Sequence, residues 1–246
     1  MKISVVTVCL NSERTIARTI ESFLAQNYVG KELVVIDGGS TDRTLEVVRS
    51  FNDRRIEVHS GPDRGMYDAM NKGLVLYRGD AVGFLNSDDR FHDDGALESI
   101  AAGLANSDAV YGDLVILKHG IPNRKIRTWH AGSYRKGSFR RGWMPPHPTF
   151  YMRRELASRV GLFDLQFGSA ADYDFMLRAL ELGNPGVSYI PRILIDFTHG
   201  GVSTNGMRSY VRGNLLCLRS RRQHLNSAPL DIALFLKPLR KLHQFR

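Results

Sequence analysis

The chain has 246 residues, of which 43% are hydrophobic, and this is enough to bury a core in one large domain or in one domain with an appendage. Its two cysteines, Cys9 and Cys217, exclude a disulfide framework, and Cys9 is expected to be a buried thiol in a strand. No apolar run reaches about 18 residues, and Ile3–Leu10 is too short for a secretion signal, so we expect a cytoplasmic protein without a membrane-spanning helix.

The net charge of +9 predicts an anionic partner: nucleic acid, an acidic membrane or a phosphorylated substrate. Acidic residues concentrate before residue 100, whereas basic residues crowd into Arg135–Arg141 and into Arg208–Arg246, where Asp231 is the single acid. A basic tail on a core of mixed charge favours docking on a surface over a nucleic-acid footprint that covers the whole protein.

Strands and helices alternate through the first hundred residues. Apolar, β-branched runs predict buried strands, and apolar residues at helical spacing predict the helices between them. In chain order we expect strand Ile3–Val8, helix Ser12–Gln26 with Ser12 as its N-cap, strand Leu33–Ile36, helix Asp42–Phe51, strand Ile56–His59, helix Tyr67–Leu76 and strand Ala81–Leu85. This alternation predicts an α/β fold with a mostly parallel central sheet flanked by helices.

The second half is less regular. Its expected elements are helix Ala96–Ala105, strand Ala109–Leu117, loops from Lys118 to Pro148, helices Arg154–Val160 and Tyr173–Leu182, and strand Ser188–Asp196, broken by Pro191. Without a clear linker, repeat or low-complexity segment, the simplest account is one domain with a basic helical extension at its C-terminal end.

Acidic side chains follow two of the expected strands. The strand that ends at Phe84-Leu85 runs into Asn86-Ser87-Asp88-Asp89, and Asp37 ends the second strand. Adjacent carboxylates at a buried edge repel each other, and a hard divalent cation such as Mg²⁺ or Mn²⁺ relieves that cost, with substrate phosphates as further ligands. Ligands of open α/β sheets bind at the carboxyl ends of the strands, where both acidic segments are expected.

The glycine-rich loops that cradle phosphate in dehydrogenases and P-loop enzymes are absent. Phosphate would therefore be held by a metal and by side chains, with Asp37 hydrogen-bonded to a base or a ribose. On the residues alone, Asp37–Ser40 can also form only a turn and a helix cap, and Asp172 and Asp174 can be solvated acids at a helix start.

An ordered set of motifs resembles family 2 glycosyltransferases of the GT-A fold, in particular small bacterial enzymes of cell-surface polysaccharide and glycolipid biosynthesis. The motifs span about residues 3–204. They are Ile3–Asn11, Val35–Asp42, Gly65–Gly73, Phe84–Asp89, His147–Tyr151, Ala171–Phe175 and Gly200–Ser203. The resemblance implies a GT-A domain at 1–205, with a donor-binding part at about 1–115 and an acceptor part at about 116–205, followed by the extension at 206–246.

The resemblance also implies roles for residues at the donor site. Asp37 matches the carboxylate that contacts the nucleotide base, usually uracil, and Thr7 belongs to the same donor-binding set. Asp63 and Lys72 match a region near the base and the phosphates. Asn86 and Ser87 open the Asp-x-Asp position, whose first residue meets the ribose.

For the metal, the resemblance implies Mg²⁺ or Mn²⁺ held by Asp88 or Asp89, and it leaves open which of the two is the main ligand. His199 resembles a histidine that completes the metal site in some relatives. Asp172 matches the general base.

These roles imply a hexosyltransferase. A metal neutralises the diphosphate that leaves the nucleotide-sugar donor, a hydroxyl of a lipid-linked or glycan acceptor attacks the anomeric carbon, and one carboxylate takes its proton, so the centre is inverted. Gln-x-x-Arg-Trp, associated with processive relatives, is absent, which favours transfer of one sugar. A nucleotidyltransferase or a nucleotide-sugar hydrolase could use the same metal–diphosphate geometry, and charge alone would allow a non-catalytic nucleic-acid-binding protein.

The C-terminal tail allows two interpretations. Residues Leu230–Leu242 mix apolar and basic side chains as a helix on an anionic membrane does. The same composition suits a helix packed on the core with a solvated basic face. The first interpretation is favoured, and it predicts a cytoplasmic enzyme that lies on the inner face of the cell membrane, without a nucleic-acid partner.

Overall fold

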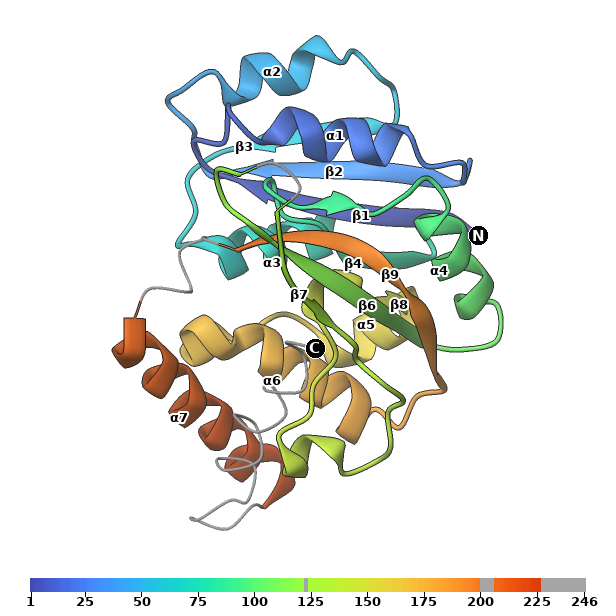
Figure 1. The fold of residues 1–246 in the computed structure, drawn as a ribbon, viewed down its shortest axis with the longest axis vertical. Coiled ribbons are helices and arrows are strands. Elements are labelled where there is room, and N and C mark those ends of the chain that lie inside the picture. The colour runs from blue at the N-terminus through green and yellow to red at the C-terminus, as the bar shows by residue number, and fades with distance from the viewer. Residues whose placement is uncertain (122–123, 200–205, 227–246) are drawn as a thin grey trace.

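A central sheet runs through the molecule with helices on both faces (Figure 1). The computed structural model describes residues 1–121, 124–199 and 206–226. Four parallel strands lie side by side in the order β3 (Ile56–Ser60), β2 (Lys31–Asp37), β1 (Ile3–Cys9) and β4 (Ala81–Phe84). Every residue of β1, β2 and β4 is buried, as in parallel sheets that are covered on both faces. The predicted α/β fold is confirmed.

The second half of the sheet is mixed in direction. The strand β8 (Tyr151–Arg153) lies antiparallel between β4 and β6 (Ala109–Lys118). The long strand β9 (Val187–His199) runs parallel to β6, and β5 (Arg90–Phe91) pairs antiparallel with β9. Through the pairing of β5 with β9, the segment that follows β4 is held against the C-terminal half of β9.

Helices cover the two faces according to their apolar stripes. On the first face, Ile16, Ile20 and Val48 pack against Val5 and Val35 in one buried cluster. The helices of this face are α1 (Ile16–Leu24), α2 (Thr44–Ser50) and α4 (Ala96–Leu104), and those of the opposite face are α3 (Met66–Leu76), α5 (Arg154–Val160) and α6 (Ala171–Leu177).

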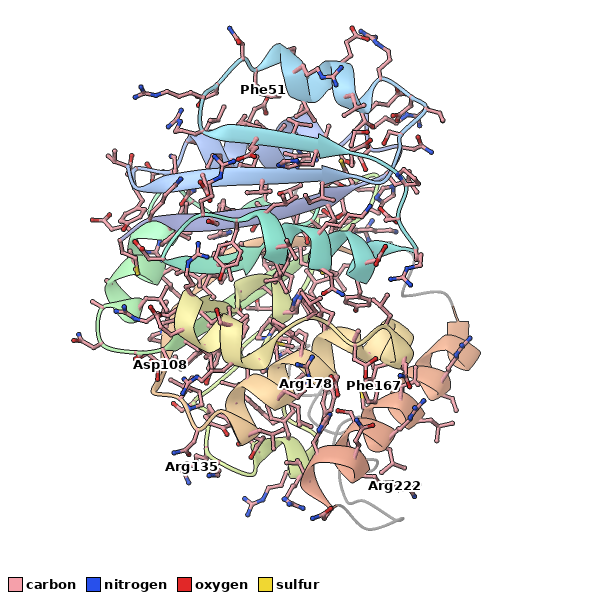
Figure 2. All side chains as sticks on the ribbon, turned by 180° about the vertical axis from the view of Figure 1, so that it is seen from behind. Phe51, Asp108, Arg135, Phe167, Arg178 and Arg222 are labelled. Atoms are coloured by element: carbon pink, nitrogen blue, oxygen red, sulfur yellow. The ribbon has the colours of Figure 1, made fainter. Side chains whose placement is uncertain are left out.

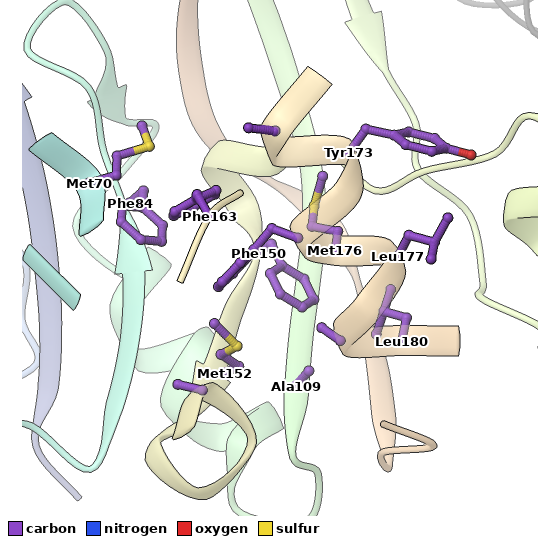
Figure 3. Packing of buried hydrophobic residues seen from close by; sticks show 14 of the residues in the cluster. Met70, Phe84, Ala109, Phe150, Met152, Phe163, Tyr173, Met176, Leu177 and Leu180 are labelled. Atoms are coloured by element: carbon purple, nitrogen blue, oxygen red, sulfur yellow. The ribbon is translucent and has the colours of Figure 1, made fainter. Parts of the chain in front are cut away.

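An aromatic cluster joins the two halves on the α3 and α6 face. Phe163 stacks on Phe175 with ring centroids 4.1 Å apart and meets the edge of Phe84 at 5.3 Å. Figure 3 shows Phe84 and Phe163 between Met70 of α3 and the side chains of α6. The first residues of α6 are therefore held close to the end of β4.

Several predicted elements are corrected. The segment Lys118–Pro148, expected to be loops, contains β7 (Lys125–Trp129), an edge strand that pairs antiparallel with β6. It also contains two 3₁₀ turns, at Ser138–Arg141 and His147–Thr149. Basic residues alternate along β7, which is how edge strands avoid aggregation, and this polarity hides the strand in the sequence.

The start of the first helix is also corrected. Ser12 is not its N-cap, because α1 begins at Ile16 and the Ser12 hydroxyl instead meets the hydroxyl of Ser87 at 2.9 Å. The strand expected to break at Pro191 continues as β9, with shifts of register opposite Gly112–Leu114 that absorb the proline.

The expected helix Tyr173–Leu182 changes character along its length. Its first part lies in α6, which ends at Leu177, and a wider π turn follows at Arg178–Leu182. A 3₁₀ segment at Leu165–Ala170 leads directly into α6.

The helix α7 (Gly206–Leu225) is fastened to α6 by buried polar groups. The fully buried Asp174 accepts hydrogen bonds from Arg178 of the π turn and from Ser220 of α7 at 2.8 and 2.9 Å, and it pairs with His224 at 3.0 Å. Phe167, labelled in Figure 2, lies 5.5 Å from the guanidinium of Arg219. The described part of the basic extension thus packs on the domain.

The proposed membrane helix Leu230–Leu242 lies outside the described residues, so its interpretation stays a prediction. Within residues 1–121, 124–199 and 206–226, no helix is long and apolar enough to cross a membrane. The boundary between 205 and 206 also stays a prediction.

Close packing of β4 on β8 gives a stability prediction. A Cβ at Gly83 would lie 2.3 Å from the ring of Tyr151, which is fully buried, whereas a Cβ at Gly61 would meet nothing within 4 Å. Gly83→Ala should lower the free energy of unfolding by about 1–3 kcal/mol through overpacking, and Gly61→Ala should change it much less. Urea unfolding followed by circular dichroism measures both, and equal stabilities of the two variants would contradict this packing.

Candidate active site

Asp37 shapes the turn at the carboxyl end of β2. Its buried carboxylate accepts hydrogen bonds from the backbone N–H of Gly39 at 3.1 Å and of Ser40 at 3.0 Å, and from the hydroxyls of Ser40 and Ser60. The turn closes because Gly39 adopts a φ of +89°, a conformation that favours glycine. Burial alone would raise the pKa of Asp37, but the hydrogen bonds from Ser40, Ser60 and Gly39 outweigh it and lower the pKa.

This lowered pKa predicts a loss of stability in acid. Because the folded pKa of Asp37 lies below the unfolded value, the carboxylate stabilises the fold above about pH 4, and this contribution disappears as the pH falls through the folded pKa. Asp37→Asn should therefore lower the free energy of unfolding by about 1–3 kcal/mol at pH 7 and by much less near pH 3. Urea unfolding of the wild type and of Asp37→Asn at both pH values measures the difference in their free energies of unfolding. An equal difference at both pH values would contradict the prediction.

Asp63 and Lys72 organise the neighbouring loop at residues 61–65. The Asp63 carboxylate accepts the N–H of Gly65 at 2.8 Å, and its other oxygen lies 2.5 Å from where a Cβ at Gly38 would be. The Lys72 ammonium donates to the carbonyl of Pro62 at 2.7 Å. Asp63 is thereby brought against the Asp37 turn, and Lys72 supports the loop from α3.

Beyond β4, Asp89 turns inward and Asp88 does not. The Asp89 carboxylate, 1% exposed, accepts the N–H of Thr198 at 2.9 Å and a hydrogen bond from the Asn86 amide at 3.3 Å. Thr19 donates to its backbone carbonyl at 2.6 Å. Apart from its own backbone N–H, the half-buried Asp88 carboxylate receives no hydrogen bond from the residues that the structure describes. The Asp89 carboxylate is thus occupied by hydrogen bonds within the protein, whereas the Asp88 carboxylate is available to a ligand.

The electrostatics of this pair favour a cation. Burial raises the pKa of Asp88, against smaller lowering effects from its own backbone N–H and from the charge of His119. Burial and the charge of Asp88 together raise the pKa of Asp89 well above its usual range. Two carboxylates whose charged forms are disfavoured in this way are stabilised by a divalent ion.

Two polar atoms nearby are buried without a partner in the described chain. They are the Thr7 hydroxyl, on a fully buried side chain of β1, and the Asn86 carbonyl oxygen after β4. Unpartnered buried polar atoms cost free energy, and a bound ligand can satisfy them. Both lie at the carboxyl ends of adjacent strands, where such a ligand would bind.

Asp172 reaches the same edge from the second half of the chain. It lies half-buried in the first turn of α6, and its carboxylate accepts the N–H of Tyr173 at 2.7 Å. Asp172 lies near Tyr67, whose pKa is raised well above its usual value by burial and by the Asp172 charge. Tyr67 stands in the first turn of α3, which follows β3 at the carboxyl edge, so Asp172 lies at that edge too.

The sequence assigns Tyr67 no role and names His147 only as part of the motif His147–Tyr151. The His147 ring, 8% exposed, stacks on Phe84 at 5.3 Å, and its Nε2 has no partner among the described residues. Burial lowers its pKa and the Asp172 charge acts in the opposite direction, so the neutral ring faces the site. The proline on each side of His147 was the one local signal, whereas nothing in the sequence pairs Tyr67 with Asp172.

His199 ends β9, where its backbone is in register with Lys118, but its side chain lies outside the description. Within the described residues, no three His, Cys, Asp or Glu side chains form a group that could hold a metal by themselves. Asp88 together with substrate oxygens still fits Mg²⁺, which typically uses one or two carboxylates plus phosphates. The structure therefore brings together Thr7, Asp37, Asp63, Asn86, Asp88 and Asp172, and leaves His199 untested.

The chain is similar to several known proteins. The model of the family "Glycosyl transferase family 2" matches residues 4–161. An uncharacterized glycosyltransferase of Mycobacterium tuberculosis is 33% identical over 224 residues, which cover 87% of this chain and 81% of the relative. A glycosyltransferase of Mycobacterium bovis, named for PGL/p-HBAD biosynthesis, is 31% identical over 209 residues, with 81% and 78% covered.

Solved structures share the fold. S. aureus TarS 1-349 superposes with a TM-score of 0.69 at 22% identity, over 99% of this chain and 72% of that one. The same TarS segment has been solved with UDP-GlcNAc, and it matches with a TM-score of 0.67 at 22% identity over 99% and 73%. The mannosyltransferase PcManGT from Pyrobaculum calidifontis, solved with GDP-Man and Mn²⁺, gives a TM-score of 0.67 at 18% identity over 99% and 69%. The fold is that of GT-A glycosyltransferases.

Proposed function

The chain belongs to glycosyl transferase family 2, and we propose that this glycosyltransferase is an inverting, metal-dependent enzyme. It transfers one sugar from a UDP- or GDP-linked donor to a hydroxyl of a lipid-linked or glycan acceptor in cell-surface polysaccharide or glycolipid biosynthesis. The observation that carries the proposal is that Asp172 lies beside Tyr67 at the edge where Asp37 ends β2 and where Asp88 follows β4.

The donor is proposed to bind along that edge. The Asp37 turn and Asp63 contact the base, Lys72 supports their loop near the phosphates, and the unpartnered oxygens of Thr7 and Asn86 meet the ribose, beside Ser87. The nucleotides bound by the structural neighbours, UDP-GlcNAc in TarS and GDP-Man in PcManGT, support a UDP- or GDP-linked donor.

Asp88 is proposed to hold Mg²⁺ or Mn²⁺ with the donor diphosphate, and His199 is proposed as a further ligand. When bound, the metal neutralises the charge that develops on the leaving diphosphate. Asp89 keeps the loop in shape, because its hydrogen bonds to Thr198 and Asn86 fasten that loop to β9.

Asp172 is proposed as the general base. An acceptor hydroxyl attacks the anomeric carbon from the side opposite the diphosphate and gives its proton to the Asp172 carboxylate. The N–H of Tyr173 donates to that carboxylate, and the Tyr67 side chain lies beside it. One displacement with one base inverts the anomeric centre.

The acceptor and the location of the enzyme are proposed from the relatives and from charge. The PGL/p-HBAD name of the mycobacterial relatives supports a glycolipid acceptor. The described part of α7 exposes Arg212, Arg219 and Arg222 beside Val211 and Leu215, a mixture that suits the surface of an anionic membrane.

A two-step experiment tests the function. Nucleotide sugars are first screened with Mg²⁺ or Mn²⁺ by thermal shift, because a bound donor stabilises the fold by mass action. The selected donor, labelled in its sugar, is then incubated with membrane lipid extracts and oligosaccharides. We expect the label to move to an acceptor. Release of free sugar alone would indicate a hydrolase, and release of sugar phosphate a nucleotidyl-transfer reaction.

The position of Tyr67 beside Asp172 gives a kinetic prediction. Tyr67→Phe keeps the packing on Phe163, 5.5 Å away, but removes the hydroxyl. We expect kcat to fall about tenfold with an unchanged KM for the donor, since the hydroxyl orients the base and does not contact the nucleotide. The control is Tyr77→Phe, which removes the hydroxyl of a tyrosine at the other end of α3, where its ring packs under Arg154. This variant should keep the wild-type kcat. A changed KM at unchanged kcat would contradict this role.

A further inference from the structure

A pocket of about 330 Å³ opens between the start of α1 and the end of the β6–β7 hairpin, and we call it the α1–hairpin pocket. Its walls include Arg14 and Arg18, Lys118 and His119, and Asp88. This volume is in the range of about 300–1,000 Å³ that is typical of small-molecule sites. Thr7, Asp37, Asp63, Lys72 and Asn86 do not line it, so the pocket shares Asp88 with the proposed donor site but none of the residues proposed to contact the base or the ribose.

Three cations of the pocket lack acidic partners. Across the described residues, the side chains of Arg14, Arg18 and Lys118 make no ion pair and no hydrogen bond. Other arginines of the domain are paired, such as Arg55 with Asp53 at 2.6 Å and Arg192 with Asp93 at 2.5 Å.

The acids of the pocket do not compensate these cations. Asp196 is held by Arg90 at 2.7 Å and by His92 at 2.5 Å, and Asp89 is held by the Thr198 N–H. Asp88 is the remaining carboxylate, and in the proposed function its charge is directed to the metal. The pocket therefore carries a positive surplus that an anion relieves.

We propose that the α1–hairpin pocket binds a phosphate-bearing group beside Asp88, with Arg14, Arg18 and Lys118 as its cationic contacts. Arginine and lysine are the side chains that proteins use for phosphate, and three of them around one space fit a phosphate monoester or diphosphate. The inference rests on the proposed function in its choice of source, because the phosphate belongs either to a phosphorylated acceptor or to the donor diphosphate.

Titration with inorganic pyrophosphate tests the site without metal or donor. Isothermal titration calorimetry in EDTA should show that Arg18→Gln and Lys118→Gln each weaken pyrophosphate binding about fivefold to tenfold. Arg159→Gln, which removes an exposed arginine of α5 outside the pocket, should leave binding unchanged. Absence of pyrophosphate binding, or equal weakening by all three substitutions, would overturn the proposal.

A second titration identifies the source of the phosphate. Decyl phosphate is titrated into protein saturated with Mg²⁺ and the nucleoside diphosphate that the thermal-shift screen selects. Binding that persists and depends on Arg18 and Lys118 assigns the pocket to a phosphorylated acceptor. Loss of decyl phosphate binding, with nucleotide affinity reduced in Arg18→Gln and Lys118→Gln, assigns it to the donor. If no nucleotide binds, the proposed function fails, while the pyrophosphate titration still decides whether the pocket binds phosphate.

Discussion

Asp172→Asn is expected to lower sugar transfer by about 10²–10⁴-fold while the affinity for the nucleotide-sugar donor stays within about twofold of the wild type. Asparagine has the same shape, so it can still accept the N–H of Tyr173, and the packing of α6 is preserved. What it loses is the ability to take the proton of the acceptor hydroxyl. Single-turnover transfer with saturating donor measures the chemical step, and thermal shift measures donor binding.

Asp164→Asn is the matched control, because Asp164 also accepts a backbone N–H, that of Gln166, and it lies in the segment that leads into α6. It should retain transfer. If Asp172→Asn retained turnover, the base would be another group. If it lost donor binding in parallel with turnover, Asp172 would belong to the donor site.

Asp88→Asn is expected to reduce the metal-dependent affinity for the donor by about 100-fold or more. The Asp88 carboxylate receives no hydrogen bond from another described residue, and burial raises its pKa, so its charge is best stabilised by an added cation. The amide is a weaker ligand for Mg²⁺ or Mn²⁺. Titration with the donor should give a much higher affinity with metal than with EDTA in the wild type, and nearly the same affinity under both conditions in the variant.

Asp89→Asn separates the two adjacent acids. Because Asp89 is fastened to Thr198 and Asn86, its replacement should affect the stability of the β4–β9 connection more than the metal dependence of donor binding. A folded Asp89→Asn variant with the larger loss of metal dependence would assign the metal to Asp89 instead.

The first half of the fold was predictable from the sequence because its strands are buried on both faces. Continuous apolar runs such as Leu33–Ile36 are unambiguous, and the acids that follow them fall at one edge by topology. The strands β7 and β8 were not predictable: β7 alternates basic residues on an edge, and β8 has only three residues, too few for a periodic signal.

The site was predictable as a set of residues but not as a set of contacts. Asp88 and Asp89 are equivalent in sequence, and only the fold shows that the Thr198 N–H takes one of them. The contact of Tyr67 with Asp172 joins segments that are far apart in the chain, so no local pattern announces it. Asp174, which the sequence presents as a second acid at a helix start, instead accepts hydrogen bonds from Arg178 and from Ser220 of α7.

The anomeric configuration of the first product distinguishes inversion from retention. The enzyme is incubated with an α-linked donor from the thermal-shift screen, and the configuration of the new bond is read by proton NMR, in the acceptor product or in the sugar that water releases slowly. A single displacement with Asp172 as base predicts the β-anomer. Formation of the α-anomer would contradict the account, because retention requires a second displacement and a different role for Asp172.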